Sequence, residues 1–196
     1  HYYYMSYFTG DWEADNLIME QVLDQVEFYS GTERKKMVKV SPKIGGSMLF
    51  GITWRGYLSP DKTRTKDEET GLYKTKVMDE YPDLKNIFRE FAKFHFPKHE
   101  WEQVQMNKNF PCPPHKDSTN ISESVLCCFG NFTGGETSVE YPVGTIQHNA
   151  RDKPVKFNGA KHPHWVEPFD GLRYSLVFFS NKSVRKSIDK KKYNSI

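Results

Sequence analysis

A histidine and an aspartate stand two positions apart in the stretch PPHKDSTN, as His115 and Asp117. In an extended segment side chains alternate between two faces, so this pair would point to the same side. An imidazole and a carboxylate on one face are two potential ligands of a metal ion. Two solvated polar residues on an exposed strand would give the same pattern, so the interpretation depends on partners elsewhere in the chain.

The stretch KHPHWVEPFDGLRYSLVFFS holds the other groups that could do chemistry. His162 and His164 are further potential metal ligands. The end of the stretch is rich in β-branched and aromatic residues, which favours a central strand, and there Arg173 and Ser175 share a face. A buried arginine needs a partner. That partner is either a nearby acidic side chain or a bound carboxylate or phosphate, which the planar guanidinium can hold at two points.

These groups occur in a definite order: His-x-Asp, a distant histidine, and then Arg-x-Ser on the last strand. Two histidines and one carboxylate hold one side of an octahedral iron and leave the other side open. The order resembles the Fe(II)- and 2-oxoglutarate-dependent dioxygenases. Residues 132–142, FTGGETSVEYP, resemble the Gly-Gly-Glu strand of the prolyl-hydroxylase-like branch. HPHWVEPFDGLRYSLVFF resembles its closing segment, His-x-Val-x-Pro followed by Gly-x-Arg-x-Ser-Leu.

The resemblance implies an iron site. Fe(II) is expected to bind His115, Asp117 and His164, which makes these three the catalytic residues. His162 shares a strand face with His164, so parity leaves both open, but the pattern His-x-Val-x-Pro selects His164. This histidine also precedes Arg173 by nine positions, and family members place the ligand nine or ten positions before the arginine. His162 is then a rim residue or a substrate contact.

The resemblance also implies a cosubstrate site. 2-Oxoglutarate is expected to chelate the iron through its keto acid end and to place its far carboxylate on Arg173 and Ser175. Asn107 stands on the strand before the first ligands, where the family often has a residue that contacts 2-oxoglutarate. An ordinary polar strand residue would look the same. O2 is the oxidant: 2-oxoglutarate becomes succinate and CO2, and a C–H bond of the substrate is hydroxylated.

The first hundred residues contain two amphipathic patterns that predict helices, over residues 12–29 and 81–95. Asp15 is the predicted N-cap of the first helix and Gly31 its stop. Between the helices, KKMVKV and SMLFGITW are strand-like runs. Residues 59–71, SPDKTRTKDEETG, are polar and charged, so they are predicted to form an exposed, mobile loop.

From residue 101 onwards, short β-like runs alternate with turn residues at a spacing near ten, which predicts a sandwich or barrel. The resemblance narrows this to a double-stranded β-helix of the jelly-roll or cupin type. No linker rich in Pro, Gly or Ser divides the chain, so a single α+β domain is expected. It comprises helical support over 1–100, the β-helix core over 101–180 and a loosely held basic tail over 181–196.

The number of cysteines and the lengths of the apolar runs indicate the cellular compartment in which the chain is expected. The three cysteines are odd in number and form no Cys-x-x-Cys pair, so a zinc site or a disulfide framework is not expected, and a reducing interior fits. Cys127 and Cys128 are expected to be core residues. No apolar run reaches membrane-spanning length and no signal peptide is visible. The chain is expected to be intracellular, and nuclear if its substrate is eukaryotic DNA; its oligomeric state is open.

The choice of substrate depends on weaker signals. NKNFPCPPHKDSTN, FTGGE and HWVEPFDGLRYSLVFF look most like the TET/JBP group, which oxidises the 5-methyl of pyrimidines in nucleic acid. DNA bearing 5-methylcytosine or thymine is therefore the expected substrate. Lysines and arginines in VRKSIDKKK and DKTRTKD could contact phosphates, and Trp54, Tyr57 and Phe50 could stack on an extruded base. A net charge of only +3 is weak for a nucleic-acid-binding chain.

Two alternatives stay open. A protein hydroxylase acting on prolyl or lysyl side chains would have the same metal and cosubstrate motifs. A β-barrel binding module could keep the fold without the chemistry, although all five expected ligand positions are filled here. A basic groove across the mouth of the pocket would favour nucleic acid, and a narrow, neutral channel would favour a peptide.

Overall fold

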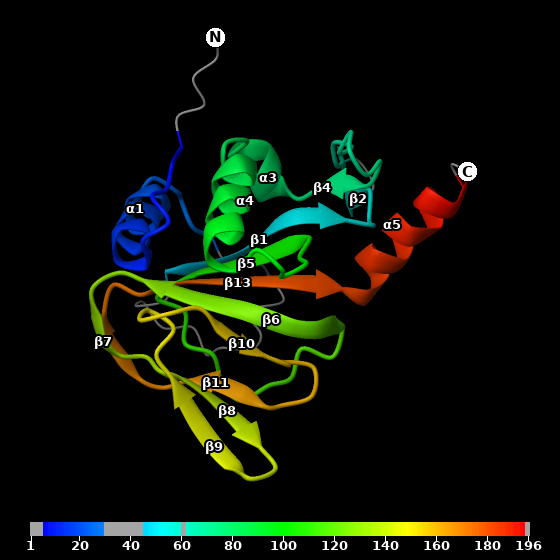
Figure 1. Ribbon diagram of the computed structural model, residues 1–196. Helices are drawn as coiled ribbons and strands as arrows, with labels where there is room; N and C mark the ends of the chain where they lie inside the picture. Colours follow the sequence, from blue (N-terminus) through cyan, green and yellow to red (C-terminus); the bar gives the residue numbers. More distant parts are fainter. Residues whose placement is uncertain (1–5, 30–44, 60–61, 195–196) are drawn as a thin grey trace.

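The computed structural model describes residues 6–29, 45–59 and 62–194, and its centre is a six-stranded antiparallel sheet (Figure 1). The predicted stop at Gly31 and the run KKMVKV lie outside these residues. The strands of this main sheet, in spatial order, are β10 Val155–Phe157, β6 Asn120–Phe129, β13 Tyr174–Asn181, β5 Gln103–Lys108, β1 Gly46–Thr53 and β4 Tyr73–Lys74. β13 therefore lies between β6 and β5 and is hydrogen-bonded to both.

A smaller sheet lies on one side of the main sheet (Figure 1). Its strands, in spatial order, are β11 His164–Val166, β8 Thr137–Tyr141 and β9 Gly144–His148. Beyond β11 a single bridge joins His115 to His164, with N–H···O distances of 3.1 and 3.0 Å in the two directions. The segment around His115 thus takes the place of a fourth strand. Two further strands, β7 Phe132–Gly134 and β12 Phe169–Gly171, pair with each other.

The chain from β5 onwards alternates between the two sheets. β5 belongs to the main sheet, the His115 segment to the smaller one, β6 to the main sheet, and β8 with β9 to the smaller one; β10, β11 and β13 continue the alternation. This arrangement is the predicted double-stranded β-helix, and the α+β class is confirmed. β1 and β4 come from the first hundred residues and extend the main sheet beside β5, so the sheet begins before residue 101. The division into one domain with three parts stays a prediction.

Helices cover the other face of the main sheet (Figure 1). They are α1 Trp12–Asp24, α3 Lys76–Glu80 and α4 Leu84–His95. The core beneath α4 is aromatic: Phe88 lies 5.0 Å from Phe50 and 5.9 Å from Phe178 between ring centroids, and Phe91 packs beside them. Burial of these large side chains is the main source of stability on this face. Among the described residues, none of the helices is long and apolar enough to cross a membrane.

The first helix differs from the prediction at both ends. It stops at Asp24 rather than residue 29, and its N-cap is Asp11, whose side chain accepts a hydrogen bond from the N–H of Ala14. Asp15, the predicted N-cap, is wholly buried inside the helix, and its carboxylate lies 2.7 Å from His95 Nε2. In the sequence, an aspartate at position 11 or at position 15 could be the N-cap. The contact that distinguishes them comes from His95, which is remote in the sequence.

Ion pairs join the acidic end of the predicted loop, residues 67–69, to α4. β2 Tyr57–Ser59 pairs with β3 Lys62–Thr63. Asp67 is buried, and Glu69 bridges Lys85 and Arg89 of α4. Hydrogen bonds from Arg89 and Lys85 lower the pKa of Glu69 to about 2. The predicted exposure is therefore wrong at Asp67, because the acidic end of the loop packs onto a basic helix.

The C-terminal segment is a helix, so the predicted loose tail is wrong. α5 spans Lys182–Asn194 and follows β13 directly. Val184 and Ile188, one turn apart, are buried in the main core cluster. Arg185 forms an ion pair with Glu102, which immediately precedes β5. Two apolar residues at helical spacing only weakly indicate a docked helix, and the many charges around Val184 and Ile188 favoured the interpretation as a loose tail.

Candidate active site

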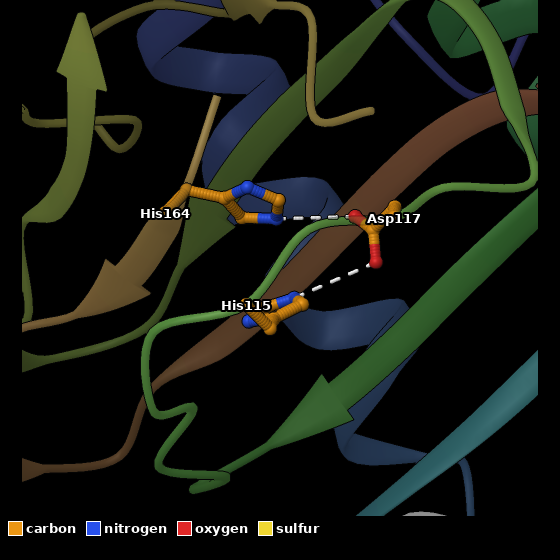
Figure 2. A group of neighbouring side chains, drawn as sticks. All are labelled: His115, Asp117 and His164. Atoms are coloured by element: carbon orange, nitrogen blue, oxygen red, sulfur yellow. Dashed lines mark hydrogen bonds and ion pairs between the residues drawn. The ribbon is translucent and has the colours of Figure 1, made fainter. Parts of the chain in front are cut away.

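The three predicted metal ligands meet at one point (Figure 2). His164 Nε2 lies 3.1 Å from Asp117 Oδ2, and His115 Nε2 lies 3.5 Å from Asp117 Oδ1. One ligand atom from each residue falls within 4.8 Å of the other two. Two imidazoles and one carboxylate therefore converge from two segments that are distant in the sequence.

Backbone hydrogen bonds place these side chains. His115 and His164 are opposite each other across the bridge, so both side chains leave the smaller sheet on the same side. The N–H of Asp117 donates to the carbonyl of Gly159 at 2.8 Å, which holds the carboxylate beside β11. A Cβ on Gly159 would lie 3.0 Å from His164 Cε1 and 3.1 Å from Asp117 Oδ2, so glycine leaves the room that the site needs.

Both imidazoles present the same nitrogen to the carboxylate. His164 Nδ1 lies 3.0 Å from the carbonyl of His162, and His115 Nδ1 lies 2.8 Å from the carbonyl of Pro113. A carbonyl can only accept, so each Nδ1 carries a proton and each Nε2 of a neutral ring offers a lone pair. Two lone pairs repel an ionised carboxylate unless a cation lies between them. The set of donors therefore fits a metal ion, and two nitrogens and one oxygen with an open side suit Fe(II).

The triad forms part of the wall of a cavity of about 250 Å³. Arg173, at one end, is 2 % exposed, whereas the side chains of His164 and Asp117 are 8 % and 29 % exposed. Arg173 thus marks the closed end and Asp117 the open end. The lining includes all six residues to which the resemblance assigns a role: Asn107, His115, Asp117, His164, Arg173 and Ser175.

Arg173 buries a guanidinium, and the described residues provide no acidic partner within ion-pair distance. Its Nε donates to the carbonyl of Gly135 at 3.1 Å, and its Nη2 lies 3.3 Å from Cys128 Sγ and 3.5 Å from Thr137 Oγ1. Burial raises the pKa of the Cys128 thiol, which therefore stays protonated and brings no negative charge. A buried charge without a counter-ion costs several kcal/mol. The arrangement therefore fits a bound anion rather than an internal ion pair.

Gly135 makes room for this guanidinium. Its φ is +71°, in the left-handed region that glycine adopts without strain. A Cβ at this position would lie 2.9 Å from Arg173 Nε. The second glycine of the Gly-Gly-Glu stretch therefore has a physical reason in this chain: it allows the turn and the close approach of the arginine.

A polar row crosses three strands of the main sheet. Ser47, Asn107 and Ser175 stand directly opposite one another on β1, β5 and β13. Ser47 Oγ donates to Asn107 Oδ1 at 2.6 Å, and Asn107 Nδ2 donates to Ser175 Oγ at 3.1 Å. Because the Ser175 oxygen accepts from Asn107, its hydrogen can donate to an anion in the cavity. Sequence reasoning missed Ser47, since only strand pairing brings it near the site.

Other residues were missed or misplaced. Cys112 and Thr137 line the cavity, and Cys112 Sγ lies 3.3 Å from His115 Nδ1. Their only sequence signal is proximity to the His-x-Asp and Gly-Gly-Glu stretches. Phe50, a predicted base-stacking residue, is buried under α4, so that prediction is wrong; Trp54 is half exposed, with the guanidinium of Arg55 5.0 Å from its ring centroid.

His162 and the adjacent cysteines have different surroundings. The ring of His162 packs against Tyr141, with centroids 4.7 Å apart, and only its carbonyl supports the triad. Cys127 is buried in the core beneath the helices, as predicted. Cys128 is buried as well, but it contacts Arg173 at the closed end of the cavity.

Comparisons with known proteins give a structural likeness. No family model and no curated protein matches the chain. The structure of NgTET1 in complex with 5mC DNA matches with a TM-score of 0.50 and 16% identity over 86% of this chain and 68% of that chain. A 2OG-Fe(II) oxygenase family protein from Burkholderia pseudomallei matches with a TM-score of 0.44 and 18% identity, over 69% of this chain and 65% of that chain. A prolyl hydroxylase from Trichoplax adhaerens matches with a TM-score of 0.48 and 14% identity, over 94% of this chain and 83% of that chain. That structure is a complex with a hypoxia inducible factor peptide fragment.

The chain spans about two thirds of the length of the first two of these structures. At such identities the likeness concerns the fold and leaves the substrate open. The alternation of strands between two sheets and the converging side chains agree with it. This chain has the double-stranded β-helix fold of the Fe(II)/2-oxoglutarate oxygenases, with a facial triad formed by His115, Asp117 and His164.

Proposed function

We propose that this protein is an Fe(II)- and 2-oxoglutarate-dependent dioxygenase that oxidises the 5-methyl group of 5-methylcytosine or thymine in DNA. One observation carries the proposal: a buried arginine without an acidic partner among the described residues lies in the same small cavity as the triad. The triad alone would suit many metalloproteins, and the arginine alone would suit many anions. Together they fit a metal chelator that carries a second carboxylate, which is the chemistry of 2-oxoglutarate.

His115, Asp117 and His164 would hold the iron. When bound together, iron, 2-oxoglutarate and O2 supply the oxidation of a C–H bond, with succinate and CO2 as the other products. The carbonyls of Pro113 and His162 accept from the two Nδ1 atoms, so both Nε2 lone pairs are directed at the ligand position. These backbone hydrogen bonds fix the orientation of both rings, which favours metal binding.

Arg173, Thr137 and Ser175 would hold the far carboxylate of 2-oxoglutarate at the closed end. The Nε of Arg173 is engaged by a backbone carbonyl and its Nη2 lies beside Cys128 and Thr137, so among the described residues Nη1 remains for the ligand. Apolar side chains, including Phe157 and Val177, line the wall alongside these polar groups. They exclude water, which strengthens each electrostatic contact inside the cavity.

The DNA part of the proposal has two supports. The stretches around His115, Gly134 and His164 resemble the TET/JBP group, and the structure with a TM-score of 0.50 is NgTET1 in complex with 5mC DNA. The open end of the cavity at Asp117 leaves one side of the triad accessible to a substrate group. A prolyl or lysyl hydroxylase would use the same metal and cosubstrate residues, so it is the alternative that the experiment must separate.

Turnover with defined substrates tests the proposal. The Fe(II)-loaded protein, 2-oxoglutarate and O2 are incubated with DNA carrying 5-methylcytosine, with unmethylated DNA and with proline- and lysine-containing peptides. We expect an oxidised base in the methylated DNA, measured by mass spectrometry, together with succinate, and no product from the Asp117→Ala protein. Oxidation of a peptide alone would assign the protein to the alternative. A protein that binds neither Fe(II) nor 2-oxoglutarate would refute the oxygenase proposal itself.

A further inference from the structure

The helix α5 carries more positive charge than the whole chain. It contains six lysines and arginines and one aspartate, a formal charge of +5, whereas the full sequence is +3. The remainder of the chain is therefore −2. The weak net charge of the sequence conceals a strongly basic element attached to a mildly acidic body. This distribution matters more for a polyanionic partner than the total does.

Some of these charges hold the helix in place. Arg185 pairs with Glu102, and Lys191 donates to the carbonyl of Gly71. Val184 and Ile188 are buried against the core. These contacts fix one side of α5 to the main sheet and to the loop before β4, so the opposite side is held toward solvent in a defined orientation.

Three lysines occupy the exposed side. Lys182, Lys186 and Lys190 are spaced four residues apart, so they follow one another along one face of the helix. We call them the lysine row. All three are exposed, and among the described residues no carboxylate lies within 4.0 Å of any of them. Eight residues of helix rise about 12 Å, so the row is about 12 Å long.

The lysine row begins at the open end of the cavity. The N–H of Lys182 donates to the carbonyl of Thr119 at 2.9 Å, and its Nζ donates to the carbonyl of Ser118 at 3.1 Å. Thr119 and Asn181 line the cavity and are joined by a hydrogen bond of 3.3 Å. Ser118 and Thr119 directly follow the ligand Asp117. From this point α5 extends away from the end of β13 (Figure 1).

We propose that the lysine row binds the phosphate backbone of the DNA strand whose base enters the cavity; the identity of the polyanion rests on the proposed function. Phosphates of one strand recur about every 3.4 Å along a duplex, so a row of this length spans about three to four of them. Lysine is a flexible point charge that binds phosphates without reading bases. The row would therefore hold a strand where it leaves the cavity mouth, independently of its sequence.

A nucleic-acid strand fits the row better than other polyanions do. An anionic membrane surface binds helices through an exposed apolar face, and the apolar residues Val184 and Ile188 of α5 are buried. A peptide substrate would also pass the mouth, but it carries no regular series of negative charges. A DNA strand carries a phosphate at every nucleotide, and its backbone has to pass the mouth when one base is inside.

DNA binding measured against salt concentration tests the proposal. The full-length protein, its Lys186→Gln/Lys190→Gln variant and a control variant, Lys76→Gln/Lys153→Gln, are titrated onto fluorescent DNA carrying 5-methylcytosine. The control removes the same charge from exposed lysines on α3 and on the loop before β10. Each lost phosphate contact lowers the slope of log K against log salt by about 0.9, so we expect a fall of about 1.8 in the row variant and an unchanged slope in the control. Lys182 is kept because it bonds beside Asp117.

The outcomes separate this proposal from the proposed function. Equal slopes for the wild type and the row variant, while the wild type oxidises methylated DNA, would overturn the row and leave the function standing. An equal fall in both variants would also overturn it, because net charge and not position would then govern binding. Competition by anionic lipid vesicles as strong as that by unlabelled DNA would assign the row to another partner. 2-Oxoglutarate affinity should be the same in all three proteins, so its loss would mean that the variants perturb the site.

Discussion

The two faces of strand β13 have different tasks. On the side of the helices it places Tyr174, Leu176 and Phe178 in the aromatic core. On the other side Ser175 and Val177 line the cavity. Adjacent residues of one strand thus belong alternately to the apolar core and to the wall of the cavity.

Strand β5 repeats the division. Val104 and Met106 are in the core, whereas Gln103, Gln105 and Asn107 line the cavity. A slip of the register by one residue would exchange the two sets, so the pairing of β5 with β13 secures both stability and function. Substitutions one position apart on these strands should therefore have separable effects on stability and on ligand binding.

The largest effect is expected on the cavity side, at the triad. His115→Ala or Asp117→Ala should reduce turnover by more than about 100-fold and weaken Fe(II) binding, because each removes a ligand while supporting partners alone are worth about 10- to 100-fold. Folding should be preserved, as judged by circular dichroism. His162→Ala is the control and should retain iron, since its side chain points to Tyr141. Iron loss in that control but not in His164→Ala would mean that the wrong histidine is assigned.

Arg173 should come next. Arg173→Lys keeps the charge but loses the two-point fork, so the affinity for 2-oxoglutarate should fall by about 1.5–3 kcal/mol, or about ten- to a hundred-fold. Arg173→Ala should cost more, because the carboxylate would be buried without a partner. Fe(II) binding should survive both changes. A titration of the iron-loaded proteins measures this, and an unchanged affinity in Arg173→Ala would remove the cosubstrate site from the cavity's closed end.

Two neighbouring residues of β13 test the comparison most directly. Leu176→Ala should lower the free energy of unfolding by about 2–5 kcal/mol, because a fully buried side chain leaves a cavity. The folded fraction should bind 2-oxoglutarate normally. Ser175→Ala should lower 2-oxoglutarate affinity by about 0.5–1.5 kcal/mol, about two- to ten-fold, with a smaller loss of stability. Urea unfolding and ligand titration of both variants measure the two effects. A larger affinity loss in Leu176→Ala, or a larger stability loss in Ser175→Ala, would refute the division between core and cavity residues.

Two glycines with positive φ separate backbone strain from crowding of Arg173. Gly135→Ala would strain the backbone and crowd Arg173 Nε, whereas Gly144→Ala strains the backbone where no atom lies within 4 Å. Both should cost about 1–3 kcal/mol of stability. Only Gly135→Ala should also weaken 2-oxoglutarate binding, several-fold, because it displaces the guanidinium. If both variants bind alike, the contact between Gly135 and Arg173 has no part in the cosubstrate site.

The triad could be predicted because local spacing was combined with the resemblance to the dioxygenases, which selected His164; the surroundings of the triad could not be predicted in this way. His115 and Asp117, like Arg173 and Ser175, are two apart, and such spacing is visible in any sequence. The type and order of most strands also follow from local alternation. The fold and the meeting of the triad agree with the prediction, whereas the roles of Arg173, Ser175 and Asn107 stay predictions that their place in the cavity supports.

What remained hidden depends on pairing over long distances. Ser47 reaches the site only through the pairing of β1 with β5, and Asp15 is buried only because His95 meets it from another helix. α5 docks through two apolar residues in a stretch whose charges suggest a free tail. Each of these contacts is set by tertiary packing, which overrides the local signal.

The single bridge between His115 and His164 has a consequence for how the molecule holds together. Among the described residues, the strand pairing between these segments consists of two backbone hydrogen bonds at the bridge and a third from the N–H of Val166 to the carbonyl of Cys112. A metal bound by both histidines and Asp117 would stabilise the paired state of the two segments. A ligand that binds only that state stabilises it by about 2.7 kcal/mol at a concentration a hundred times its dissociation constant. Occupancy of the proposed iron site would then lower the population of locally opened molecules, in addition to its part in the reaction.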